Sequence, residues 1–138
     1  MTGIIVTGHG HFASGIMSSV ELIMGTQENV IPVDFPYGDT ITELEANINS
    51  AIEKFDGDII VFADLLCGSP FNVATMAALK YERIRVVYGT NLGMLVESIM
   101  SLSQGMNTDE LVDKAVMTGK TQVGKFEKSS DEEDDFDN

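Results

Sequence analysis

The feature of the sequence that most constrains its fold is a regular alternation of short apolar runs with longer amphipathic stretches. Residues 3–7, 30–35, 59–63 and 84–88 are rich in β-branched and other apolar side chains, which is typical of strands buried on both faces. The stretches between them repeat apolar residues at helical spacing. The sequence therefore predicts an α/β fold, an open, mostly parallel, doubly wound sheet with helices on both faces.

Start and stop signals place the helices. A capping-box pattern begins at Thr40. Ser69 is predicted to be the N-cap of a later helix, with Pro70 at its first helical position. Residues 121–126, which follow Gly119, are predicted to form a last strand. The expected helices are 12–24, 40–55, 69–79, 92–102 and a short one capped by Asn107.

The chain is strongly acidic. Its 138 residues carry 22 Asp and Glu against 8 Lys and Arg, a net charge of −14, and residues 131–138 hold six of the acids. A chain of this length suits one domain that buries about 70% of its unfolded surface. We assign residues 1–128 to that domain and 129–138 to an acidic, disordered tail, with partner steering as the tail's alternative role. The remaining body is also acidic, which disfavours nucleic acid and favours a basic protein partner.

Cysteine and hydropathy patterns indicate the compartment. Cys67 is the only cysteine, which excludes a disulfide framework and suits a reducing compartment. We expect Cys67 to be a small buried hydrophobic residue. The first residues enter an apolar run without a basic flank, and no later stretch approaches the roughly 20 apolar residues of a membrane span. The sequence predicts a cytoplasmic protein without membrane insertion.

Three loops are expected at the carboxyl ends of the strands, where open parallel sheets form their sites. They are residues 7–11, 64–69 and 89–91, and the first contains both histidines of the protein, His9 and His11. Glycines allow the backbone to approach a ligand closely. The helix that follows offers free amides and the positive end of its dipole. These features favour a phosphate group as the ligand.

Other interpretations of these residues stay open. The two imidazoles can cap backbone groups in a turn, or form half of a metal site that Asp64 and Cys67 would complete. Asp64 can also be a helix-capping or solvent-facing acid. Ser69 is expected to cap its helix in either case.

Nucleophilic catalysis gives a sharper hypothesis. An imidazole attacks through one ring nitrogen when the other carries the proton. Asp64, at the end of a neighbouring strand, can accept that hydrogen bond from His9 and stabilise the charge that develops on the ring. The amide and hydroxyl of Ser69 can bind the oxygens of a transferring phosphoryl group. Because the sequence has no Walker loop, dinucleotide fingerprint or carboxylate triad, we expect no cofactor and no metal.

Three segments carry a family resemblance. They are GIIVTGHG at 3–10, Asp followed by GSPFN within 64–72, and GTNLGML at 89–95. Together they resemble the EIIA component of the mannose family of bacterial phosphoenolpyruvate:sugar phosphotransferase systems, over residues 3 to about 126. Such proteins take a phosphoryl group from the phosphocarrier HPr onto a histidine and pass it to EIIB, which phosphorylates sugar entering through the membrane subunits EIIC and EIID.

The resemblance implies roles for individual residues. His9 takes the phosphorylated position, Asp64 orients it and Ser69 contacts the phosphoryl group. His11 does not occupy the phosphorylated position and is expected at the rim or at a partner contact. The resemblance also implies a homodimer in which a C-terminal antiparallel strand, residues 121–126, crosses to the other subunit. EIIB is expected to be a separate protein.

Two features depart from the family pattern, and two rival functions stay open. Residues 65–67 vary the family loop, and the acidic tail is not a family feature. The sequence GHGHF at 8–12 is similar to the corresponding segment of EIIA proteins for amino sugars such as N-acetylgalactosamine. The first rival is the phosphocarrier subunit that feeds a dihydroxyacetone kinase. The second is a non-catalytic module that binds an anion or a metal reversibly.

Overall fold

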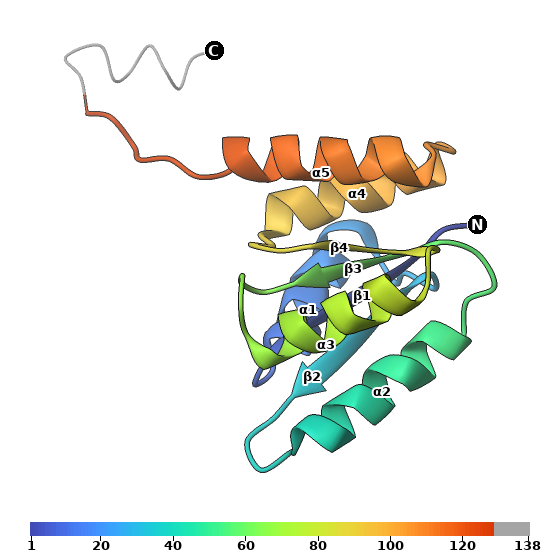
Figure 1. Ribbon diagram of the computed structural model, residues 1–138. Coiled ribbons are helices and arrows are strands. Elements are labelled where there is room, and N and C mark those ends of the chain that lie inside the picture. The colour runs from blue at the N-terminus through green and yellow to red at the C-terminus, as the bar shows by residue number, and fades with distance from the viewer. Residues whose placement is uncertain (129–138) are drawn as a thin grey trace.

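The computed structural model describes residues 1–128, and its centre is a four-stranded sheet (Figure 1). Its strands are β1 (Gly3–His9), β2 (Val30–Phe35), β3 (Ile59–Ala63) and β4 (Ile84–Val87). They lie in the order β2-β1-β3-β4, and all neighbouring pairs are parallel. The predicted α/β class with a parallel sheet is confirmed.

Helices cover both faces of this sheet. One face packs against α1 (Phe12–Met24), α4 (Leu92–Ser103) and α5 (Thr108–Thr121), and the other against α2 (Ile41–Glu53) and α3 (Ser69–Lys80). Successive strand residues point to opposite faces. Ile4 and Val6 of β1 therefore pack in the core beneath α1, α4 and α5, and Ile5 packs in the core beneath α2 and α3. Burial on both faces explains why the strands are apolar at consecutive positions.

Two helix starts test the capping predictions. Thr40 accepts a hydrogen bond from the N–H of Glu43 in a complete capping box, as predicted. The N-cap of α3, however, is Gly68 in an extended conformation, and Ser69 is already the first helical residue. The prediction of Ser69 as N-cap is therefore wrong by one position. Pro70 lies within the first turn, where its missing N–H costs no helical hydrogen bond.

The C-terminal part of the described chain differs from the prediction. The helix capped by Asn107 is not short, because α5 runs for 14 residues to Thr121. Residues 122–128 form neither helix nor strand in this chain, so the predicted strand at 121–126 is absent from the single subunit. Strand β4 is left as a sheet edge, with Val86 and Val123 lining a groove beside it. The acidic tail at 129–138 lies outside the described residues.

Within residues 1–128, no helix combines the length and the apolar character that a membrane crossing needs.

Candidate functional site

The sheet order places a crevice between β1 and β3. After β1 the chain continues through α1 to β2 on one side, and then crosses through α2 to β3 on the other side. Open α/β sheets bind their ligands at such a switch point, outside the carboxyl ends of the strands. His9 is the last residue of β1 and Asp64 directly follows β3. The two predicted residues therefore flank the switch point.

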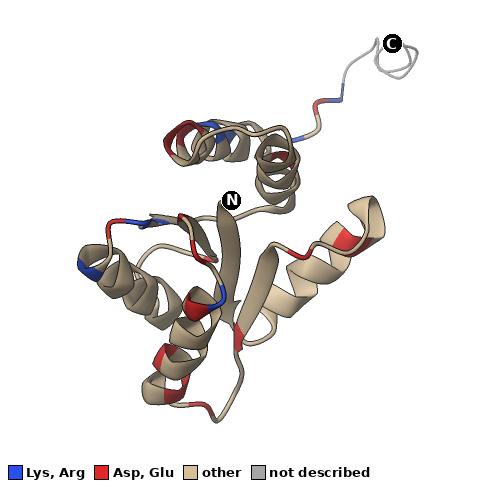
Figure 2. Ribbon diagram, turned by 90° about the vertical axis from the view of Figure 1, so that its right-hand side faces the viewer, with Lys and Arg blue, Asp and Glu red and all other residues tan. Residues whose placement is uncertain are grey.

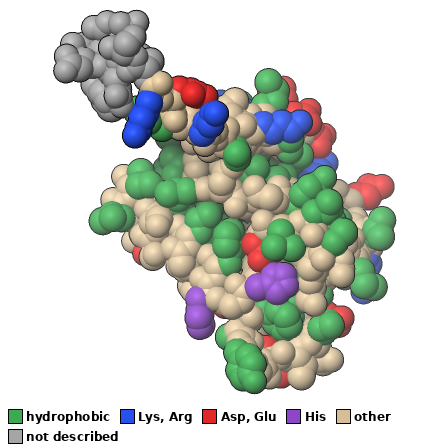
Figure 3. Space-filling model, turned by 90° about the vertical axis from the view of Figure 1, so that its left-hand side faces the viewer, with side chains coloured by type: hydrophobic (Ala, Val, Ile, Leu, Met, Phe, Trp, Pro, Cys, Tyr) green, Lys and Arg blue, Asp and Glu red, His purple; other side chains and the backbone are tan. Residues whose placement is uncertain are grey.

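His9 and Asp64 are in direct contact. The Nδ1 atom of His9 lies 2.8 Å from Oδ2 of Asp64, and the same oxygen accepts the backbone N–H of His9 at 2.9 Å. The His9 side chain is 48% exposed, whereas that of Asp64 is 10% exposed. Figure 3 shows the two histidines of the chain on one face of the molecule. A shielded carboxylate thus holds an imidazole that partners can reach.

Asp64 is held in its ionised form. Burial of the carboxyl group opposes ionisation, but hydrogen bonds from the backbone and ring of His9 and from the N–H of Leu65 outweigh it and lower the pKa of Asp64. An ionised carboxylate only accepts hydrogen bonds. Nδ1 of His9 must therefore carry a proton, and in the neutral ring Nε2 keeps a free lone pair.

Two glycines allow this close packing. A Cβ on Gly8 would lie 2.9 Å from Cβ and Cγ of Asp64, and a Cβ on Gly68 would lie 2.5 Å from Cε1 and 3.1 Å from Nε2 of His9. The Cε1–Nε2 edge of the His9 ring therefore lies beside Gly68, the N-cap of α3. Ser69 opens the first turn of α3, and the N–H groups of a first turn have no partner within their own helix.

The lowered pKa of Asp64 makes its contribution to stability dependent on pH. The carboxyl stabilises the fold fully above its ordinary pKa of 3.8, and this contribution is lost as the pH falls through the lower pKa of the folded state. Urea unfolding of the wild type and of Asp64→Asn should therefore give a difference in free energy of unfolding that shrinks as the pH falls from about pH 5 toward pH 3. A difference that does not change with pH would contradict this assignment of the Asp64 charge.

Gly68→Ala should disturb the His9 ring rather than the fold. The backbone of Gly68 is extended, with φ −123°, so alanine fits the backbone but its methyl group overlaps the ring. A displacement of about 1 Å can cost 100-fold in the rate of a reaction, so we expect any group transfer to His9 to slow at least about tenfold. Gly15→Ala is the matched control, because a Cβ there meets nothing within 4 Å. Quench-flow rates with melting temperatures test this, and equal rates for both variants would contradict it.

A second histidine–carboxylate pair was missed by the sequence interpretation. Nδ1 of His11 lies 3.2 Å from Oδ2 of Asp34, near the end of β2. Asp34 also accepts the hydroxyl of Ser14 at 2.6 Å and its N–H at 2.9 Å. The next residue, Phe35, packs its ring 6.2 Å from the ring of His9. The signal for this pair was a lone acid in an otherwise apolar strand.

The prediction that Cys67 is buried is wrong, and residues 1–128 give no support to the metal hypothesis. Cys67 is exposed and has a φ of 63°, because the turn from β3 to α3 needs a left-handed residue there. His9 and His11 engage different carboxylates, Asp64 and Asp34. In the part of the chain that the structure describes, no group of three or more His, Cys, Asp and Glu side chains could hold a metal ion.

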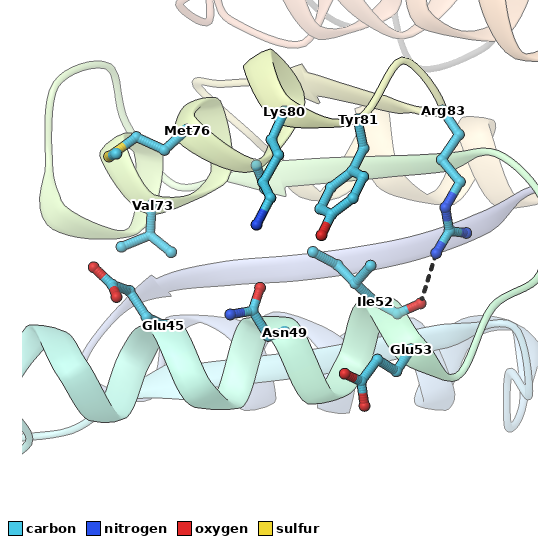
Figure 4. A pocket seen from close by; sticks show the side chains of 10 residues that line it. Glu45, Asn49, Ile52, Glu53, Val73, Met76, Lys80, Tyr81 and Arg83 are labelled. Carbon is cyan, nitrogen blue, oxygen red and sulfur yellow. Dashed lines mark hydrogen bonds between the residues drawn. The ribbon is translucent and has the colours of Figure 1, made fainter.

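A groove of about 440 Å³ lies elsewhere, between α2 and α3 (Figure 4). Arg83 lies at one end of the groove. Its guanidinium donates hydrogen bonds to the carbonyl oxygens of Phe55 at 2.8 Å and Gly57 at 2.6 Å, and these bonds anchor the segment that follows α2. None of the predicted site residues lines this groove. The lining residues are Glu45, Asn49, Ile52, Glu53, Val73, Met76, Ala77, Lys80, Tyr81 and Arg83.

Known proteins resemble the chain over nearly its whole length. A family model, EIIA-man, described as "PTS system fructose IIA component", matches residues 3–116. The chain is 36% identical over 126 residues to the mannose-specific EIIAB component of Escherichia coli K12, covering 89% of this chain and 39% of the relative. It therefore spans less than half the length of that relative.

Two further proteins match over most of both chains. The sorbose-specific EIIA component of Lacticaseibacillus casei is 31% identical over 137 residues, which covers 96% of this chain and 99% of the relative. The crystal structure of an EIIA component from Streptococcus agalactiae has a TM-score of 0.85 and 35% identity, and covers 91% of this chain and 97% of that one.

Proposed function

Because the chain belongs to the EIIA family of the mannose-type phosphotransferase systems, we propose that it carries a phosphoryl group on His9, which it takes from phospho-HPr and passes to EIIB. The observation that carries this proposal is the 2.8 Å contact between Nδ1 of His9 and the carboxylate of Asp64. This contact leaves Nε2 as the attacking atom.

The transfer step needs no external base. Nε2 of neutral His9 attacks the phosphorus, and the N–P bond of the donor phosphohistidine breaks as the Nε2–P bond forms. The electron pair of the broken bond returns to the donor imidazole. The proton on Nδ1 stays in place, and Asp64 stabilises the positive charge that grows on the ring.

Backbone and hydroxyl groups of α3 are suited to the phosphoryl oxygens. The transferring group carries spread negative charge, which preorganised donors stabilise. The amides of Ser69 and Phe71 lie in the first turn of α3, directly after Gly68, which is packed against the Cε1–Nε2 edge of the His9 ring. We assign Ser69 a contact to the phosphoryl group on this basis.

The proposed assembly follows the family. We propose that residues 1–128 form one EIIA domain that works in the cytoplasm as a homodimer, with EIIC and EIID acting downstream of EIIB. The open edge of β4 and the apolar groove beside it support an exchanged C-terminal segment, because an unpaired strand edge is a ready template for another chain.

Incubation with phosphoenolpyruvate, enzyme I and HPr tests the function. The intact mass should increase by one phosphate per chain, and the gain should vanish when HPr is omitted. The added phosphate should be acid-labile. Reversible phosphate binding without a covalent mass change would instead favour a non-catalytic binding module.

A further inference from the structure

The ring of Phe35 lies against the ring of His9 from the neighbouring strand β2. The two ring centroids are 6.2 Å apart and the ring planes are inclined at 59°. His9 and Phe35 are partners in the parallel pairing of β1 with β2, so both side chains project from the same face of the sheet. This is the face that α2 and α3 cover, whereas α1 covers the opposite face (Figure 2). The transfer step proposed for His9 does not involve the Phe35 ring.

The backbone holds Phe35 beside the acceptor histidine. Gly10 directly follows His9, and its N–H donates to the carbonyl oxygen of Phe35 at 2.8 Å while its carbonyl oxygen accepts the N–H of Phe35 at 3.1 Å. Gly10 has a left-handed φ of 57° at this bridge. The Phe35 side chain is partly buried and packs against the core beneath α2 and α3. Both the backbone and the side chain of Phe35 are therefore held in place.

The hydrogen bond to Asp64 does not by itself fix the tilt of the His9 ring. It fixes the tautomer at Nδ1, but a ring held at one atom can still change its tilt through its two side-chain torsions. Because the His9 side chain is 48% exposed, close packing does not surround it. Gly68 bounds the Cε1–Nε2 edge of the ring, and the Phe35 ring bounds it from the side of β2. These two contacts limit the directions in which Nε2 can point.

The tilt of the imidazole decides how well Nε2 can attack. Group transfer needs the reacting atoms about 3 to 3.5 Å apart with their orbitals aligned, and a misplacement of about 1 Å can cost about 100-fold in rate. Aromatic rings at such separations favour tilted or offset arrangements over face-to-face stacking. The ring of Phe35 therefore favours particular tilts of the His9 ring, which an aliphatic side chain at this position would not do.

We propose that Phe35 is a positioning residue for phosphoryl transfer, whose ring holds the imidazole of His9 at the tilt that brings Nε2 in line with the bond that breaks in the donor. This inference rests on the proposed function. Phe35 forms no bond to the phosphoryl group, and the transferred group goes to His9. Because Phe35 acts on the geometry inside the docked complex, loss of its ring should lower kcat and leave KM nearly unchanged.

Rapid-quench kinetics with phospho-HPr as the donor test this proposal. For Phe35→Leu we expect kcat to fall about five- to tenfold, with KM within about twofold of wild type. Phe35→Tyr keeps the aromatic ring and should recover kcat to within about twofold of wild type. Phe55→Leu is the matched control, because Phe55 packs against the same core but its ring lies beside Gly3, at the other end of β1. It should lower the melting temperature and leave kcat unchanged.

Carbon-13 relaxation of the His9 ring in the unphosphorylated protein gives a second readout that needs neither donor nor turnover. The ring should be rigid in the wild type and in Phe35→Tyr, more mobile in Phe35→Leu and unchanged in Phe55→Leu. A His9 ring that already moves freely in the wild type would overturn the proposal, even if Phe35→Leu failed to fold.

Four kinetic outcomes would also overturn it. These are an unchanged kcat for Phe35→Leu, a loss confined to KM, an equal loss of kcat in Phe55→Leu, and a folded Phe35→Tyr variant as slow as Phe35→Leu. In all of them the wild type still takes up one phosphate on His9, so the proposed function stands. A wild type that takes up no phosphate would refute the proposed function and this inference with it.

Discussion

His9→Ala is expected to abolish phosphate uptake from phospho-HPr. The variant loses the nucleophile itself, so we expect the rate to fall by more than about 1000-fold, as for loss of other catalytic nucleophiles. Intact mass and acid-labile radiolabel over a long time course measure this. The fold should survive, because the His9 side chain is half exposed.

The matched control for His9→Ala is His11→Gln, which removes the other histidine of the same loop. At saturating phospho-HPr it should reach one phosphate per chain. Phosphate in His9→Ala at the wild-type rate would refute the assignment of His9.

Asp64→Asn is expected to slow transfer by about 100- to 10,000-fold, because a neutral amide neither fixes the His9 tautomer nor stabilises the charge on the ring. The loss should fall on kcat rather than on KM, since Asp64 lies under His9 and is only 10% exposed. Single-turnover kinetics with phospho-HPr separate the two. Asp34→Asn serves as the comparison, because that carboxylate holds His11 instead of His9.

A rate for Asp64→Asn within a few-fold of wild type would remove Asp64 from the mechanism. Circular dichroism should show a folded variant, because the substituted asparagine side chain keeps one oxygen that can accept the N–H of His9.

The central contact was predictable because it follows from strand ends. Consecutive apolar runs identify β1 and β3, and parallel strands bring their carboxyl ends to one edge. That edge holds His9 and Asp64, which the structure shows in contact. Their catalytic roles, and that of Ser69, stay predictions.

The contacts of His11 were not predictable from the sequence pattern. They depend on β2 lying beside β1, and periodicity does not give the order of strands. Asp34 stands out as the one acid in the apolar strand β2, but the local sequence does not show that its carboxylate reaches Ser14 and His11.

The last helix is longer than predicted, and the strand predicted at residues 121–126 is absent from the described chain. Gly119 lies inside α5, which continues to Thr121. A Cβ at Gly119 would collide with the side chain of Met94 on α4. The glycine therefore serves close packing of α4 and α5 rather than chain reversal.

The site of attachment of the phosphate tests the account most directly. Nitrogen-15 and phosphorus NMR of the phosphorylated protein, with ¹⁵N-labelled histidine, distinguishes the two ring nitrogens. Because Asp64 occupies Nδ1, we expect one phosphate on Nε2 of His9. A phosphate on Nδ1 of His9, or on any other residue, would contradict the account.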